Sequence, residues 1–218
     1  MIRYIREKIT FPAADGKAAL NGELMLHPEK EPDGCAIVCH PHPGFGGSMH
    51  NYVVAELGRL LCDAGFVSLR FDFRSVGMAS EECGSAGEVE DIRGAVEFAK
   101  SKGYEKFILV GYSFGSHMAF RACAGGLVPD RLILVALPSE PPFVNPEEFA
   151  AVYLTMPTLM VSGDNDEYSN METLKKRFGS APNISCKTVP DCDHFFSSQE
   201  SFGEMIACVK VFLSGSGQ

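Results

Sequence analysis

The chain has 218 residues, of which 45% are hydrophobic and 22% are charged, and this is enough for one domain with a substantial core. Its 28 acidic and 19 basic residues give a formal net charge of -9 at pH 7. Such a chain lacks the positive surplus that neutralises phosphates, so we expect neither nucleic acid nor a membrane as a partner. The composition leaves the oligomeric state open between a monomer and a homodimer.

The N-terminal segment MIRYIREKIT is charged and strand-like, and it lacks the apolar core of a secretory signal peptide. No apolar run reaches the length that spans a bilayer. We therefore expect a cytoplasmic protein. The cysteines lie inside apolar segments such as residues 35–39, and no Cys-x-x-Cys pair suggests zinc, so we expect buried free thiols in place of disulfides.

The first thirty residues predict an antiparallel hairpin at the edge of a sheet, with its turn at residues 14–17. Short apolar runs rich in β-branched residues then predict buried strands at 34–40, 66–71, 106–111, 131–136 and 157–162. Alternation at 184–189 predicts one more strand. Between and after these runs, helical periodicity predicts three apolar stripes: Val53, Val54, Leu57, Leu60 and Leu61; Val89, Ile92, Val96 and Ala99; Phe202, Met205, Ile206, Val209, Phe212 and Leu213.

This order of elements predicts a three-layer α/β fold, in which a mostly parallel sheet of about eight strands carries helices on both faces. We expect a single domain over residues 1–213 and a flexible tail over 214–218. Ligands of open α/β sheets bind beyond the carboxyl ends of the strands, so the residues just after each apolar run are the candidates for function.

The segment Gly111-Tyr112-Ser113-Phe114-Gly115 follows one of these strands and opens a helix. A strand, a sharp turn and a helix form the setting of a nucleophile elbow. The glycines let strand and helix approach closely, while the turn exposes the serine hydroxyl and directs the helix N-terminus at developing negative charge. The alternative interpretation is a glycine-rich turn with a surface serine.

A serine hydroxyl needs a histidine to accept its proton and a carboxylate to orient that histidine. Asp166 follows the strand at 157–162, and His194 follows the strand at 184–189. Both lie at carboxyl ends of strands, where the loops meet the elbow. The sequence therefore predicts catalysis by Ser113, Asp166 and His194.

Other residues compete for these roles. Asp164 and Glu167 are close enough in sequence to replace Asp166, although an aspartate beside a glycine commonly serves a turn. His117 lies one helical turn after Ser113 and is the alternative to His194, but a residue there more often packs or caps. The sequence leaves these alternatives open.

The loop after the strand at 34–40 contains two prolines, which have no backbone N–H to stabilise an oxyanion. His42, Gly44 and Phe45 remain as donors, and we favour His42 together with the amide of Phe114. His40, His42 and His50 also allow a metal site. We favour a structural role for His40, hydrogen-bonded beneath the loop, and we expect no metal and no cofactor.

Four motifs in this order resemble the α/β-hydrolase superfamily over nearly the whole chain: residues 40–51 (HPHPGFGGSMHN), residues 69–77 (LRFDFRSVG), Gly-Tyr-Ser113-Phe-Gly-Ser and Asp-His194-Phe-Phe. Within it they are similar to small hydrolases near the dienelactone hydrolases and feruloyl-type esterases. The resemblance implies an α/β-hydrolase fold, the triad Ser113, Asp166 and His194, and oxyanion donors at His42 and Phe114. Dienelactone hydrolases carry cysteine in the elbow, so their activity is not implied.

A further departure lies at residues 74–77, which read Arg-Ser-Val-Gly where the family usually has Arg-Gly-x-Gly. We expect this change to affect only a turn. The connection between residues 137 and 156 is short, with a brief helix over 146–152, and it predicts a minimal lid and an open, shallow site. Phe45, Tyr112, Phe114, Phe143 and Phe195 are the predicted lining.

We therefore expect a carboxylesterase-like serine hydrolase that cleaves a small ester through an acyl-enzyme on Ser113. Thioester or amide cleavage would use the same three residues. A non-catalytic binding protein that uses the same cleft is the alternative of a different class. The presence of all three triad residue types argues against it.

Overall fold

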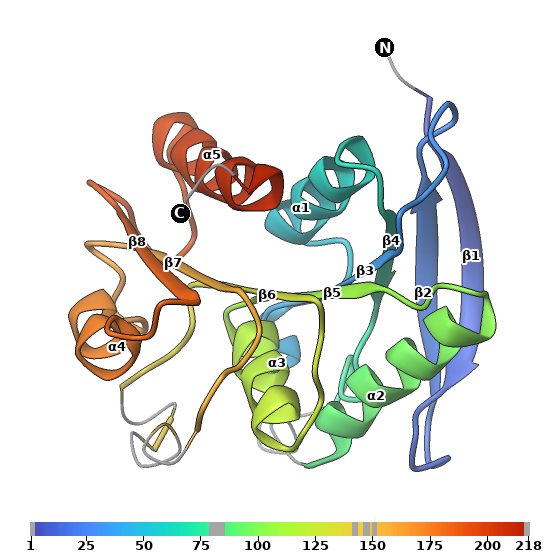
Figure 1. Ribbon diagram of the computed structural model, residues 1–218. Helices are drawn as coiled ribbons and strands as arrows, with labels where there is room; N and C mark the ends of the chain where they lie inside the picture. Colours follow the sequence, from blue (N-terminus) through green and yellow to red (C-terminus); the bar gives the residue numbers. More distant parts are fainter. Residues whose placement is uncertain (1–2, 79–85, 141–143, 146–148, 150–151, 216–218) are drawn as a thin grey trace.

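The structure is a computed structural model that describes residues 3–78, 86–140, 144, 145, 149 and 152–215. An eight-stranded sheet in the order β1-β2-β4-β3-β5-β6-β7-β8 forms its centre (Figure 1). The strands are β1 (Ile5–Pro12), β2 (Ala19–Leu26), β3 (Cys35–Cys39), β4 (Val67–Phe71), β5 (Phe107–Tyr112), β6 (Arg131–Val135), β7 (Thr158–Gly163) and β8 (Ile184–Val189). Each predicted strand is present within one or two residues of its expected ends.

The N-terminal hairpin lies at one edge of this sheet, as the sequence predicted. β1 pairs antiparallel with β2, which pairs antiparallel with β4. All pairs from β4 to β8 are parallel. Every side chain of β3, β4 and β5 is buried, which is why β3 and β5 read as continuous apolar runs, whereas β4 also buries Ser68 and Arg70. The outer strand β8 is largely half-buried or exposed, and only Val189 is fully buried.

Helices cover both faces of the sheet (Figure 1). α1 (Tyr52–Asp63) and α5 (Gln199–Ser214) lie on one face, and α2 (Ala86–Ser101), α3 (Phe114–Ala124) and α4 (Met171–Phe178) lie on the other. Each face has its own apolar cluster: the residues of α1 and α5 pack in one, and those of α2, α3 and α4 pack in the second. The predicted three-layer α/β fold is therefore confirmed.

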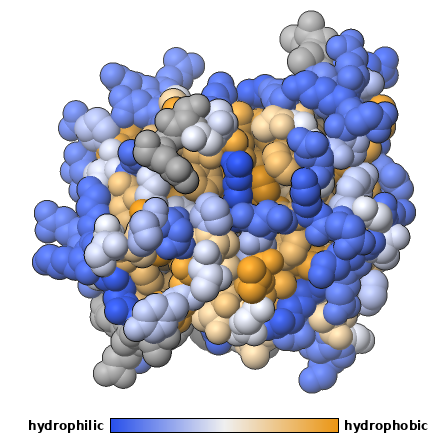
Figure 2. All heavy atoms as spheres, viewed as in Figure 1, coloured by the Kyte–Doolittle hydropathy of each residue, from blue (hydrophilic) through white to orange (hydrophobic). Residues whose placement is uncertain are grey.

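The three predicted helical stripes are the buried faces of α1, α2 and α5. Val53, Leu57 and Leu61 are fully buried in α1, and burial of one such side chain stabilises the fold by about 1.5–3 kcal/mol. The N-terminus of α1 is capped because Asn51 accepts a hydrogen bond from the Val53 amide at 2.9 Å. On the face drawn in Figure 2, hydrophilic residues predominate along the rim and hydrophobic residues gather near the centre.

Several details differ from the predictions or extend them. The sequence analysis did not predict α4, a short helix that buries only Met171, Leu174 and Phe178. Ser214, assigned to the flexible tail, is the last residue of α5. The brief helix predicted over 146–152 falls mostly outside the described residues. Seven cysteines in the described part are free thiols, five of them buried. No helix in that part is long and apolar enough to cross a membrane.

Candidate active site

The turn between β5 and α3 holds Ser113 in a backbone conformation that serine rarely adopts, with φ at 54° and ψ at -118°. Such strain persists only where the surroundings enforce it. A Cβ atom on Gly111 would lie 2.4 Å from the Gly115 carbonyl oxygen, and one on Gly115 would lie 2.4 Å from the Cys39 carbonyl oxygen. Both glycines are therefore required for the close approach of α3 to the strands beneath it.

The structure brings Ser113, His194 and Asp166 into one hydrogen-bonded chain, although the serine and the histidine are 81 positions apart. Ser113 Oγ lies 2.8 Å from His194 Nε2. His194 Nδ1 lies 2.8 Å and 2.9 Å from the two carboxylate oxygens of Asp166. With Nδ1 donating to the carboxylate, Nε2 is left as an acceptor that can take the serine proton.

The loop after β7 distinguishes the competing acids by their partners. Asp166 Oδ1 also accepts hydrogen bonds from the amides of Tyr168 and Ser169, both at 2.9 Å, and its side chain is fully buried. Asp164 instead accepts from the Cys192 amide at 3.2 Å and so joins two loops. Glu167 is exposed. Of these three carboxylates, Asp166 is the one that contacts His194.

Aromatic rings surround His194, which is 7% exposed. The ring centroid of Tyr168 lies 4.6 Å from that of the imidazole, and those of Phe195 and Tyr112 lie at 5.4 Å and 6.0 Å. The Tyr112 hydroxyl donates to the His194 carbonyl oxygen at 3.1 Å, while the Tyr52 hydroxyl donates to the carbonyl of Phe195. These contacts fix the loop and keep bulk water from the imidazole.

His40 anchors the loop that follows β3. It is fully buried, and Nε2 accepts a hydrogen bond from the Phe73 amide at 3.0 Å while Nδ1 contacts the Pro41 carbonyl oxygen at 2.6 Å. Burial lowers its pKa to about 4, and nearby His42 acts in the same direction. The Pro41 carbonyl and Asp72 offset part of this effect. Both ring nitrogens therefore have partners within the protein, as expected for a residue that holds the loop.

The side chain of His42 also serves the local backbone, because its Nδ1 accepts from the Gly44 amide at 3.1 Å and caps a short 3-10 turn at Pro43–Phe45. Burial lowers the pKa of this imidazole. The described residues contain no group of three or more side chains that could hold a metal ion.

His42 and Phe114, the two predicted oxyanion donors, both line the pocket that contains Ser113. The rings of His42 and Phe114 lie 4.9 Å apart at their centroids, so the loop after β3 and the start of α3 meet here. No described residue accepts a hydrogen bond from the backbone N–H of either. Donors that are fixed in place and have no other acceptor are the groups that stabilise a developing oxyanion.

Unfavourable backbone conformations concentrate around this site. Among the described residues other than glycine, those with a positive φ are Ser113, Ala136, Asp191 and Phe196. Ala136 follows β6, and the last two flank His194 in the loop after β8. All of them lie at the carboxyl ends of strands, as expected where backbone strain serves function.

A pocket of about 750 Å³ opens onto Ser113 and His194. Phe45, Tyr112, Phe114 and Phe195 line it as predicted. Phe45 and Phe195 are 79% and 57% exposed, so they form the mouth. The fifth predicted ring, Phe143, lies outside the described residues.

The pocket also extends along α3. His117, Met118 and Arg121 line it, so it follows this helix for about two turns. The sequence analysis missed Met118 and Arg121, and it treated His117 only as a competitor of His194. These residues repeat at helical spacing in the sequence, but the same spacing is typical of a helix that packs in a core. Pro138, Tyr168 and Asn51 were missed too.

The turn at residues 74–77 accommodates its unusual sequence. Ser75 is not among the described residues with positive φ, whereas Gly77 has φ at 87°. The serine therefore occupies a conformation that any residue can adopt. Arg74 holds the turn by binding Asp91 through Nε at 2.7 Å and Asp15 through both terminal nitrogens at 2.9 Å.

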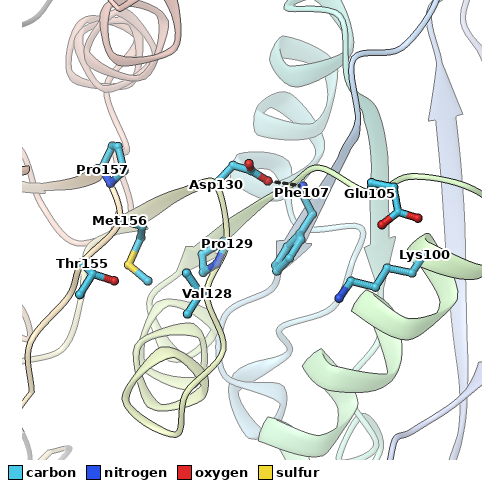
Figure 3. A pocket seen from close by; sticks show the side chains of 9 residues that line it. All are labelled: Lys100, Glu105, Phe107, Val128, Pro129, Asp130, Thr155, Met156 and Pro157. Atoms are coloured by element: carbon cyan, nitrogen blue, oxygen red, sulfur yellow. Dashed lines mark hydrogen bonds between the residues drawn. The ribbon is translucent and has the colours of Figure 1, made fainter.

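A second hollow of about 460 Å³ lies at the amino ends of β5, β6 and β7, opposite the carboxyl ends that hold Ser113 (Figure 3). Its Asp130 accepts a hydrogen bond from the Phe107 amide at 2.8 Å and thus ties two strand starts together. Lys100 and Glu105 at its rim are exposed. Since ligands of parallel sheets bind at the carboxyl ends of strands, the pocket at Ser113 is the better candidate.

Comparison with known proteins settles the family. A family model described as "Alpha/beta hydrolase family" matches residues 37–157, more than half of the chain. The chain belongs to this family. The match begins in β3 of this α/β hydrolase and ends just before β7, so it includes Ser113 and stops short of Asp166 and His194.

This α/β hydrolase is similar to a curated protein and to several solved structures. It is 27% identical over 184 residues to an uncharacterized protein of Rickettsia prowazekii, covering 78% of this chain and 76% of the relative. It is 28% identical to an α/β serine hydrolase without a lid from Xanthomonas campestris, with a TM-score of 0.80 and coverage of 97% and 94%. Est1E from Butyrivibrio proteoclasticus, solved with ferulic acid, shares the fold at 20% identity and a TM-score of 0.76, with coverage of 95% and 98%. The predicted resemblance and the fold with a minimal lid are confirmed.

Proposed function

We propose that this protein is a serine esterase that cleaves small carboxylic esters through a covalent intermediate on Ser113. The observation that carries the proposal is the continuous chain of hydrogen bonds from Ser113 through His194 to Asp166, at 2.8 Å for each of its two shortest links. Such a chain lets a serine hydroxyl lose its proton as it attacks. The similarity to a lid-less serine hydrolase of Xanthomonas campestris supports the same reaction class.

In the first half of the reaction, Ser113 Oγ forms a bond with the ester carbonyl carbon while its proton passes to His194 Nε2. The Asp166 carboxylate stabilises the imidazolium and keeps its orientation. The tetrahedral adduct collapses when the bond between carbon and the alcohol oxygen breaks. The leaving alcohol takes the proton from His194, and the acyl group remains on the serine.

In the second half, a water molecule attacks the acyl carbon and gives a proton to His194. The bond to Ser113 Oγ then breaks, the serine regains the proton, and the acid is released. During both steps, negative charge develops on the former carbonyl oxygen. We assign its stabilisation to the backbone amides of His42 and Phe114, which costs little reorganisation because both are already held in place.

The proposal is tested by labelling with a fluorophosphonate, which reacts with activated serines. The wild-type protein should be labelled on Ser113, and Ser113→Ala should be unlabelled. Asp166→Asn, which can hold His194 in the wrong tautomer, should slow labelling by orders of magnitude, whereas Asp164→Asn and Glu167→Gln should not. Mass spectrometry of peptides locates the adduct. Labelling that survives in Ser113→Ala would overturn the assignment.

Hydrolysis of p-nitrophenyl esters of graded acyl length measures the activity itself. We expect turnover of short acyl chains by the wild type and none above the uncatalysed rate by Ser113→Ala. Parallel thioester and amide substrates define the preferred leaving group. A protein that binds these compounds but turns over none of the three classes would instead be a non-catalytic binding protein.

A further inference from the structure

One face of α3 forms a wall of the pocket. Phe114, His117, Met118 and Arg121 all line the cavity, and their spacing of three and four residues places them in a row along one side of the helix. The row starts next to the nucleophile and ends at a guanidinium. A substrate group that extends from Ser113 along this wall therefore meets Arg121.

The charge of the pocket contrasts with that of the chain. The protein carries a formal net charge of -9, yet among the described residues that line the pocket there is an arginine and neither an aspartate nor a glutamate. The remaining ionisable lining residues are histidines and tyrosines. In a partly enclosed, largely apolar cavity a guanidinium exerts a stronger field than at the surface, although the buried Glu88 carboxylate also acts on His42 at this pocket.

The geometry sets the distance at which the cation acts. Arg121 lies seven positions after Phe114, which corresponds to about 10 Å along a helix axis. Because helical side chains lean toward the N-terminus, we expect the guanidinium to lie nearer to Ser113 than this distance. Arg121 already interacts with another group of the chain. Its five N–H donors allow it to bind a second partner as well.

We propose that the preferred substrate of this site carries a carboxylate remote from the scissile ester, and that Arg121 is the residue that binds it. This inference rests on the proposed esterase function. The carboxylate and the guanidinium form a bidentate pair, and His117, one helical turn nearer to Ser113, borders the same path. A neutral chain of equal length fills the pocket without this pair and gains less from binding.

The test compares pairs of esters that differ only in the terminal charge. One series consists of mono-p-nitrophenyl esters of succinate, glutarate, adipate and suberate, each paired with its methyl-capped neutral form. A second series carries the carboxylate on the alcohol side. We expect kcat/KM for the charged member to exceed that for its neutral partner by roughly tenfold or more at one chain length, in one of the two series. The series that shows this preference identifies the side of the ester that lies along α3.

Variants at Arg121 link the preference to that residue. In Arg121→Gln the ratio should fall toward one, in Arg121→Lys part of it should remain, and Arg121→Glu should reverse it in favour of a terminal ammonium. Arg59→Gln is the matched control, because Arg59 lies on α1, where it pairs with Glu56 and Asp63. This variant should keep the wild-type ratio, which excludes a general effect of net charge.

The outcomes separate the inference from the proposed function. Hydrolysis of neutral and charged esters at equal kcat/KM in both series would overturn the inference and leave the esterase function intact. Calorimetric titration of Ser113→Ala with the charged and neutral esters requires no turnover. Two results would overturn the inference even if no ester were cleaved. Ser113→Ala could bind the charged ester more weakly than the neutral one, or the double variant Ser113→Ala/Arg121→Gln could keep the same preference for the charged ester as Ser113→Ala.

Discussion

The buried imidazole of His40 makes a quantitative prediction about acid stability. In the unfolded chain its pKa is 6.5, and burial lowers it to about 4 in the folded protein. Between these values the unfolded state binds a proton that the native state excludes, so stability falls as the pH decreases. For this group alone, the loss relative to neutral pH is about 2 kcal/mol at pH 5 and about 3 kcal/mol at pH 4. About one pH unit above 6.5 and higher, this contribution is constant.

Burial is the main physical cause of this shift, and the hydrogen bond that His40 Nε2 accepts from the Phe73 amide at 3.0 Å also favours the neutral ring. A protonated ring has a hydrogen on both nitrogens, so Nε2 can no longer accept. The amide then loses its partner in a site with no exposed surface at His40. As the pH falls, the loop after β3 should therefore lose its ordered structure before the residues around Ser113 do.

Urea unfolding at pH 7, 6, 5 and 4 measures this effect. His40→Asn cannot titrate, so it should be less stable than the wild type at pH 7 but should lose about 2 kcal/mol less between pH 7 and pH 5. His50→Asn removes an exposed imidazole and should keep the wild-type slope. Parallel stability curves for the wild type and His40→Asn would refute the reasoning, because the pH dependence would then come from other groups.

Two further predictions concern the scaffold. Gly115→Ala places a Cβ atom 2.4 Å from a backbone carbonyl oxygen at the end of β3, so this variant should have a much lower thermal midpoint or fail to fold. Gly203→Ala in α5 places a Cβ atom with nothing within 4 Å, so it should stabilise the protein by about 0.5–1 kcal/mol. Equal thermal midpoints for the two variants would contradict this reasoning. Arg74→Met leaves the fully buried Asp91 carboxylate without its ion pair and should lower the free energy of unfolding, measured with urea, by about 3–5 kcal/mol. Arg6→Met removes an exposed arginine from its ion pair and should change the free energy of unfolding by less than about 1 kcal/mol.

Much of the fold could be predicted because its central strands are buried on both faces. Residues 35–39 and 107–112 have no exposed side chain, so they appear in the sequence as uninterrupted apolar runs. The hairpin at the N-terminus was recognisable from alternation and a turn. α4 was missed because it is short and buries only three side chains, which gives too little periodicity to distinguish it from a loop.

For the site, the sequence supplied the candidates but could not choose among them. Asp164, Asp166 and Glu167 lie within four positions, and only three-dimensional placement decides which carboxylate contacts His194. The inner wall of the pocket was hidden for a different reason. A helix that lines a cavity and a helix that packs in a core show the same spacing of large side chains, so Met118 and Arg121 carry no separate signal.

The gathering of positive-φ residues around Ser113 has a consequence for engineering this molecule. Local conformations that cost about 1–3 kcal/mol each must be offset by contacts in the rest of the domain. Substitutions that relieve this backbone strain would raise thermostability, but they would also move the side chains on which turnover depends. The safer route to a hardier variant starts at the outer surfaces of α2 and α5, where a gain in free energy leaves the geometry around the nucleophile untouched.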